Sequence, residues 1–158
     1  MNAHRFQTGF TIVEVLVALV VLAVGMLGMA SLYVTTLRSS GTALSRMQAV
    51  TLAADMADRI RANRFARALY ETEEPVEQDC IADGDCTREQ MVANDLFVWQ
   101  EQIDEVLPGE DPEGTIEYTA PTATTPDSYT ITVTWKEAQS EGNDAEELRY
   151  VLTMEVAP

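Results

Sequence analysis

Basic residues are scarce in this sequence. Ten lysines and arginines stand against 26 aspartates and glutamates, so the formal net charge is −16 at pH 7. A chain of this charge repels the phosphate backbone of DNA or RNA, and we therefore expect no nucleic-acid partner. The sequence also lacks a P-loop and a Gly-rich dinucleotide turn, which excludes these two nucleotide-binding motifs.

The few bases are unevenly distributed. Residues 38–67 contain six arginines and two acids, whereas residues 71–117 contain sixteen acids and a single arginine. The chain therefore has an apolar beginning, a basic and amphipathic middle, and an acidic C-terminal part. A carboxylate-rich surface either is solvated or binds cations, and we favour the solvated surface.

Charge is almost absent from residues 10–34. These 25 residues contain one charged side chain and no proline. As a helix they would cover roughly 37 Å, more than the roughly 30 Å of a bilayer core. A secretory signal peptide has a shorter apolar region of about 7–15 residues and then a small-residue cleavage site. The long run favours a retained membrane anchor, and Arg5 before it places that end in the cytoplasm.

The single charge in this run is Glu14. An unpaired carboxylate inside an apolar helix is destabilised by several kcal/mol. No basic residue lies within two turns after Glu14, and Arg5 could pair with it only if the first residues were retained. Either the carboxylate lies close enough to the membrane surface to stay hydrated, or it is kept for a function. We favour a function.

The stretch "TGFTIVEVLVALVVL" resembles the class III signal of type IV pilins and related pseudopilins. The shared pattern is a short leader that ends in glycine, then a phenylalanine, then a glutamate four residues later. The resemblance implies that a prepilin peptidase cuts between Gly9 and Phe10 and methylates the new N-terminus of Phe10. It also implies that Glu14 pairs with the N-terminal amine of a neighbouring subunit during filament assembly, which would supply the missing counter-charge.

The resemblance divides the chain into four parts. Residues 1–9 are the cleaved leader, residues 10–34 a transmembrane helix that becomes the filament core, and residues 35–70 an amphipathic helix that packs on the head. Residues 71–158 are an acidic periplasmic α+β head. Major pilins often have a proline further along the long helix. Because this chain has none there, it is more similar to a minor pilin or a pseudopilin.

We expect a type IV pilin fold of the α+β class. A single helix should extend from Phe10 to Leu69, with its first half in the membrane and its second half on a small antiparallel sheet, and a further short helix should follow. The apolar residues of the second half form one stripe at helical spacing that we expect to be core. That stripe is Leu37, Leu44, Met47, Val50, Ala54 and Ala57, with Leu52, Met56 and Ile60 beside it.

The acidic part predicts one helix and three strands. The helix covers residues 87–107, with Thr87 as its cap, Gln90 three residues later, and Pro108-Gly109 at its end. The strands are expected at residues 114–120, 128–137 and 148–156, the second with apolar residues alternating with threonines. Residues 138–147 should form a hairpin loop.

Cysteine occurs twice, at Cys80 and Cys86. In a head outside the cytoplasm the two are expected to form a disulfide that closes a short loop. Asp79, Asp83 and Asp85 in the same loop superficially suggest a calcium site. However, no glutamate closes a twelve-residue pattern and Cys86 interrupts it, so we expect no metal.

The head sequence at residues 80–137 resembles that of PilV-type minor pilins, in which a short helix ends in Leu-Pro-Gly before the sheet and a late strand contains tryptophan. The resemblance implies a minor pilin that primes assembly of a type IV pilus, enters it at or near the tip, and supports twitching motility and attachment. Its partners would be other minor pilins, the major pilin, the prepilin peptidase, the inner-membrane assembly platform and a tip adhesin. It would lie in the bacterial inner membrane with its head in the periplasm, and then in the pilus.

Two other functions stay open on the residues. A minor pseudopilin of a type II secretion system shares this N-terminus, and a signal-anchored periplasmic domain would never polymerise. We expect no enzyme and no cofactor. The one histidine, His4, belongs to the expected leader, so the mature chain has none for a Ser-His-Asp or Cys-His arrangement or for a histidine-ligated zinc. The many carboxylates leave a hydrolase that uses two of them as an open alternative.

Overall fold

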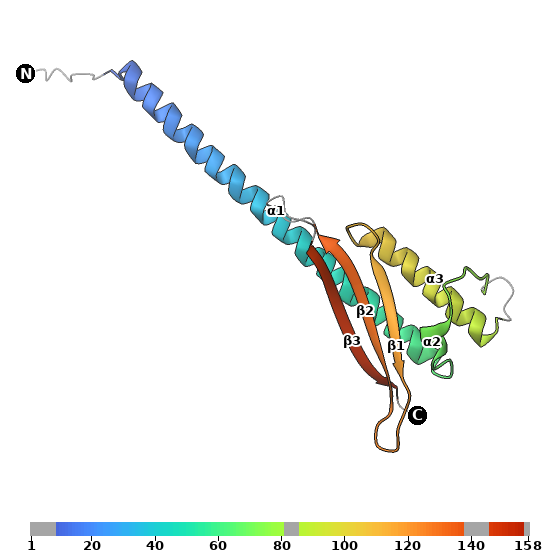
Figure 1. Cartoon of the computed structure of the whole chain (residues 1–158). Helices are drawn as coiled ribbons and strands as arrows, with labels where there is room; N and C mark the ends of the chain where they lie inside the picture. The colour runs from blue at the N-terminus through green and yellow to red at the C-terminus, as the bar shows by residue number, and fades with distance from the viewer. Residues whose placement is uncertain (1–8, 81–85, 138–145, 157–158) are drawn as a thin grey trace, which may run out of the picture. The chain divides into compact units, whose positions relative to one another are not determined.

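A computed structural model of the chain describes residues 9–80, 86–137 and 146–156. The elements are α1 (Ile12–Ala62), α2 (Leu69–Thr72), α3 (Arg88–Val106), β1 (Glu113–Thr119), β2 (Asp127–Glu137) and β3 (Glu146–Val156), as Figure 1 shows. They confirm the expected α+β class, with a long apolar N-terminal helix, a three-stranded antiparallel sheet and a further helix. The chain divides into two compact units, Met1–Gly41 and Thr42–Pro158.

The described part of the first unit is the apolar beginning of α1. The helix contains an 18-residue stretch with a mean hydropathy of 2.7, and none of that stretch is buried. Large side chains such as Leu19, Val24 and Leu27 are exposed along it. By length and composition this helix can cross a membrane. Because so much apolar surface is unstable in water, lipid or another protein must cover it.

The second unit has one hydrophobic core, to which α1, α3 and the sheet all contribute. Along β2 the side chains alternate between buried and half-buried, as the period of a strand requires. The largest fully buried side chains include Trp99, Tyr70, Tyr129, Met56 and Ile60. The strands pair antiparallel in the order β1-β2-β3, so consecutive strands are neighbours.

The face of α1 that enters this core differs from the expected stripe. Leu37, Leu44, Met47 and Val50 are 62%, 50%, 62% and 42% exposed, and Ala54 is exposed too. The prediction that they are core residues was wrong. The expectation is confirmed for Ala57 and for Leu52, Met56 and Ile60 beside the stripe, which are buried. The small residues Ala49 and Ala53 complete the buried face with them. Alanines let a helix approach its neighbours closely, and this leaves the bulkier residues of the next face outside.

The helix also ends earlier than expected, at Ala62 rather than near Leu69. The chain turns after it, with Arg67 in the left-handed region at φ 47°. Arg59 then forms ion pairs with Asp55 at 2.8 Å and with Asp95 of α3 at 3.2 Å. The Tyr70 hydroxyl donates a hydrogen bond to the other carboxylate oxygen of Asp95 at 2.9 Å. These contacts join α1, α2 and α3.

Helix α3 and the three strands lie where the sequence predicts a helix and three strands. Thr87 caps α3, and its side chain and that of Gln90 form the expected capping box. Each predicted strand begins within two residues of the observed one. The predicted hairpin loop lies almost entirely outside the described residues. Between α1 and α3, the indole N–H of Trp99 donates a hydrogen bond to the carbonyl oxygen of Leu52 at 3.0 Å.

We predict that Gly114→Ala destabilises the head. A methyl group at Gly114 of β1 would collide with the Trp99 ring and the Ile103 side chain, and the hydrogen bond to Leu52 prevents the ring from moving aside. Overpacking of this kind lowers the free energy of unfolding by about 1–3 kcal/mol. Gly41→Ala is the matched control, because its methyl group would meet nothing within 4 Å, and it should instead stabilise α1 by up to about 1 kcal/mol.

Thermal unfolding of the detergent-solubilised chain, followed by near-ultraviolet circular dichroism, measures both variants. Equal melting temperatures for Gly114→Ala and the unchanged chain would contradict the packing described at Trp99.

We also predict that stability falls in alkali. Burial raises the pKa of Tyr129 to about 12, and burial together with the neighbouring Asp95 raises the pKa of Tyr70 further. An unfolded tyrosine ionises near pH 10. The unfolded chain therefore loses these protons first, and the free energy of unfolding should decrease as the pH rises from about 10 to 12. Urea titrations at a series of pH values measure this decrease, which should be shallower in Tyr70→Phe. An unchanged dependence of the free energy of unfolding on pH would contradict the raised pKa of Tyr70.

Candidate functional site

The first turn of α1 begins at a threonine. The Thr11 hydroxyl oxygen accepts a hydrogen bond from the backbone N–H of Glu14 at 3.3 Å. The Thr11 carbonyl oxygen accepts from the N–H groups of Glu14 and Val15 at 3.1 and 3.3 Å. Thr11 therefore acts as the N-cap. Sequence reasoning missed this residue, although its Thr-x-x-Glu spacing is the same kind of signal that predicts the cap at Thr87.

Glu14 lies in this first turn and is exposed. The helix dipole favours a negative charge at this end by about 0.3–1 kcal/mol. No lysine or arginine occurs from Gly9 to Leu37. The next base, Arg38, lies 24 residues further along, which is roughly 36 Å of helix. The apolar part of the chain therefore contains no basic side chain that can neutralise Glu14.

The surface around Glu14 is a hollow along one side of the helix, with a volume of about 510 Å³. Its lining residues are Phe10, Glu14, Val15, Ala18, Leu19 and Leu22. Apolar walls beside one carboxylate suit a ligand that is itself apolar and has a positive charge at its end. An N-terminal amine followed by a hydrophobic residue has this chemistry.

Gly9 and Phe10 precede the helix, and both are exposed, Phe10 by 83%. The peptide bond between them is therefore accessible, and glycine offers no Cβ to obstruct an enzyme that binds the backbone closely. Residues 1–8 lie outside the described residues. The cut after Gly9 and the methylation of Phe10 stay predictions.

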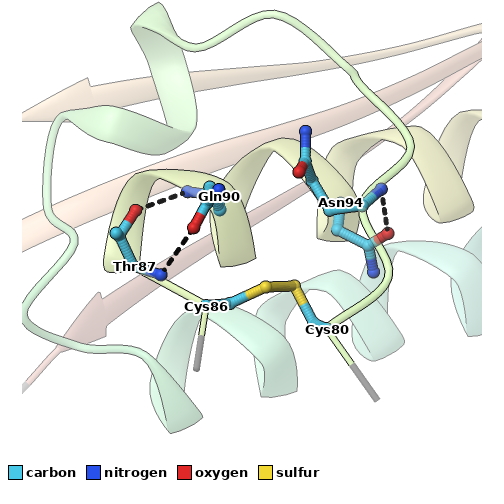
Figure 2. Close-up of a disulfide and its surroundings, with 6 residues drawn as sticks. Cys80, Cys86, Thr87, Gln90 and Asn94 are labelled. Carbon is cyan, nitrogen blue, oxygen red and sulfur yellow. Dashed lines mark hydrogen bonds between the residues drawn. A yellow bond between two sulfur atoms is a disulfide. The ribbon is translucent and has the colours of Figure 1, made fainter. Parts of the chain in front are cut away.

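Cys80 and Cys86 form a disulfide. Figure 2 shows that it lies directly before the capping box of α3, where the Gln90 side chain accepts a hydrogen bond from the Thr87 N–H at 2.9 Å. The loop before the disulfide is held to the same helix, because the Gln78 N–H donates to the Asn94 side chain at 3.0 Å. The disulfide therefore fixes the start of α3.

The acids of this loop are only partly described. Asp79 is exposed, whereas Asp83 and Asp85 lie outside the described residues. Within residues 9–80, 86–137 and 146–156, no three acidic, cysteine or histidine side chains form a group that could hold a metal ion.

The arginines at the end of α1 have different environments. Arg59 contacts Asp55 and Asp95, and Arg61 pairs with Asp58 at 2.7 Å. Arg64 lies over the Phe65 ring instead. The arginines at this end of α1 therefore contact carboxylates of α1 and α3 or an aromatic ring.

Two family models match the chain. A model described as type IV pilin Tt1218 matches residues 31–97, and a model of the prokaryotic N-terminal methylation motif matches residues 4–30. The two matches are adjacent and together extend from residue 4 to residue 97. The methylation motif includes Gly9, Phe10 and Glu14, and the pilin model includes both cysteines. No curated protein and no solved structure matches the chain.

We predict that the disulfide stabilises the head. Replacing both cysteines by serine should lower the free energy of unfolding by roughly 2 kcal/mol, because the open loop gains conformational entropy in the unfolded chain. Urea denaturation of the purified chain measures the loss. In parallel, a thiol-reactive reagent should label neither Cys80 nor Cys86 until a reductant is added. Labelling of both without reductant would disprove the bond.

Proposed function

Because the chain belongs to the type IV pilin family, we propose that it is a minor pilin that primes assembly of a type IV pilus and enters the filament at or near its tip. Proteins of this family are structural rather than enzymatic. Prepilin peptidase removes residues 1–9 and methylates Phe10. The chain waits in the inner membrane with its head in the periplasm, and the assembly platform then transfers it into the filament beside other minor pilins and the major pilin. In this position it supports twitching motility and attachment, with a tip adhesin as a further partner.

The environment of Glu14 is the observation that supports this proposal most strongly. Its carboxylate lies at the start of an uncovered apolar helix, in a hollow with apolar walls and without a basic side chain from Gly9 to Leu37. Cleavage creates a positive amine on each subunit. When a neighbouring subunit brings its amine to Glu14, the two charges neutralise each other in a medium of low dielectric constant, where their attraction is strong. This contact sets the axial register of one helix on the next.

Exposed apolar residues on the second part of α1 also favour assembly. Leu44, Met47 and Val50 lie in the unit that contains the head, yet they are 42–62% exposed. Met47 and Leu52 of α1 form a groove of about 400 Å³ with Val106 of α3, and most of the surface of this groove is apolar. A helix that served only as an anchor would gain nothing from apolar residues beside its soluble domain. In a filament, the helices of neighbouring subunits cover them.

A minor pseudopilin of a type II secretion system remains the second candidate, because the N-terminal motif is common to both systems. The resemblance of residues 80–137 to PilV-type heads favours the pilus. Deletion of the gene separates the two: a minor pilin is needed for piliation and twitching, whereas a pseudopilin is needed for protein secretion. An anchored domain that never polymerises would be needed for neither.

We predict that Glu14→Ala leaves processing intact but lowers incorporation into pili by at least about tenfold, since it leaves the amine of a neighbour buried without a partner. Quantitative immunoblotting of sheared pili measures incorporation. Mass spectrometry of the membrane fraction should still find a chain that begins at methylated Phe10.

Glu117→Ala on β1 is the control, because it removes an exposed carboxylate of the head without touching the helix. Normal incorporation of Glu14→Ala would refute the role of Glu14. A chain that retains its first nine residues in pili would refute the proposed processing.

A further inference from the structure

An aromatic side chain between two arginines projects from the turn after α1. Phe65 is 63% exposed. The guanidinium carbon of Arg64 lies 4.8 Å from the centre of its ring, and that of Arg88, the first residue of α3, lies 5.8 Å from it. Arg88 also donates a hydrogen bond to the Phe65 carbonyl oxygen at 3.5 Å. These three residues are called the Phe65 knob below.

A single exposed phenylalanine is common on protein surfaces, but this one is held by two charges. Each cation–π contact contributes about 0.5–1 kcal/mol at an exposed site, so the ring is kept in place in contact with water. In the described part of the chain neither Arg64 nor Arg88 forms an ion pair, whereas Arg59 and Arg61 do. Arginine and aromatic residues are the types that contribute most to protein interfaces. The knob therefore suits a partner with carboxylates around an apolar hollow.

The same chain contains such a surface. A hollow of about 670 Å³ lies between α2, α3 and β1, and no basic residue lines it. Tyr70, Leu96 and Ile116 form its apolar part. Five carboxylates also line it: Glu71, Glu73, Asp104, Asp111 and Glu113. Because the described acids form no group that could hold a metal ion, the hollow matches a broad cationic side-chain surface better than a metal ion.

We propose that the Phe65 knob of one copy docks into this carboxylate hollow of a second copy. The ring enters the apolar part, and Arg64 and Arg88 pair with the carboxylates at the rim. With a net charge of −16, two copies repel each other, so a local match of opposite charges both offsets that repulsion and selects one orientation. Knob and hollow are different surfaces, so the contact between the two copies is head-to-tail. The inference rests on the proposed function, because copies of the chain then wait in the same inner membrane before they enter the filament.

A photo-reactive phenylalanine at Thr115 tests the contact in the full chain, in the bacterium that produces it. Thr115 is exposed, uncharged and lines the hollow. Irradiation should give a cross-linked dimer, and mass spectrometry should map the bond to residues 64–67 or 88 of the second copy. Charge reversal of the knob, Arg64→Glu with Arg88→Glu, should lower the dimer yield roughly tenfold. Arg149→Glu on β3, an exposed arginine outside the knob, is the control and should change the yield little.

A compensating variant shows whether the charge reversal of the knob breaks the contact between copies or unfolds the head. Adding Glu71→Arg and Glu113→Arg to the knob reversal restores opposite charges, so the dimer should return. A failure to return, a bond to another part of the chain, or a bond only to a different protein would overturn the proposal. Electron microscopy of the same cells counts pili: pili without the mapped cross-link refute the knob contact alone, whereas absence of the chain from pili refutes the proposed function.

Discussion

The position of Glu14 is the constraint on which the account depends. Its charge lies in an apolar helix where an unpaired carboxylate is destabilised by several kcal/mol. The Thr11 cap stabilises the backbone of the first turn, and the helix dipole contributes about 1 kcal/mol at most. These two effects do not offset the loss of hydration, so most of the compensation must come from outside the apolar segment. We propose that an amine created by cleavage on a neighbouring subunit supplies it, so that an unfavourable charge becomes a condition for assembly.

Within the second unit, α1 has one face that is buried in the head and another that is exposed. Small residues on one face, such as Ala49, Ala53 and Ala57, allow the head to pack closely, with Trp99 bonded to the Leu52 carbonyl. The bulkier Leu44 and Met47 stay exposed beside that face. The Arg59–Asp95–Tyr70 contacts and the Cys80–Cys86 disulfide fix the helices that surround this packing. The head thus has a hydrophobic core of its own, while the side of α1 with Leu44 and Met47 stays exposed.

Much of this architecture could be predicted from local signals. The capping box at Thr87, the alternation in β2 and the length of the apolar run depend only on nearby residues. The buried face of α1 could be predicted only in part, at Leu52, Met56 and Ile60. Hydrophobicity also favours Leu44 and Met47, whereas close packing favours the alanines. The early end of α1 depends on a turn with Arg67 in the left-handed region. An arginine at this position does not predict such a turn. Phe65 and Arg88 lie 23 residues apart in the sequence, so their contact could be identified only from the folded structure.

The distance between the Glu14 carboxylate and the N-terminal amine of a neighbouring subunit decides whether the two groups form an ion pair in the filament. Solid-state NMR can measure it in pili that combine this chain, labelled with ¹³C at its glutamate carboxylates, with neighbouring subunits labelled with ¹⁵N at their N-termini. We expect a carbon–nitrogen coupling that corresponds to an ion pair, with an N···O distance of about 4 Å or less. No such coupling between subunits, or a coupling only to the amine of the same chain, would contradict it.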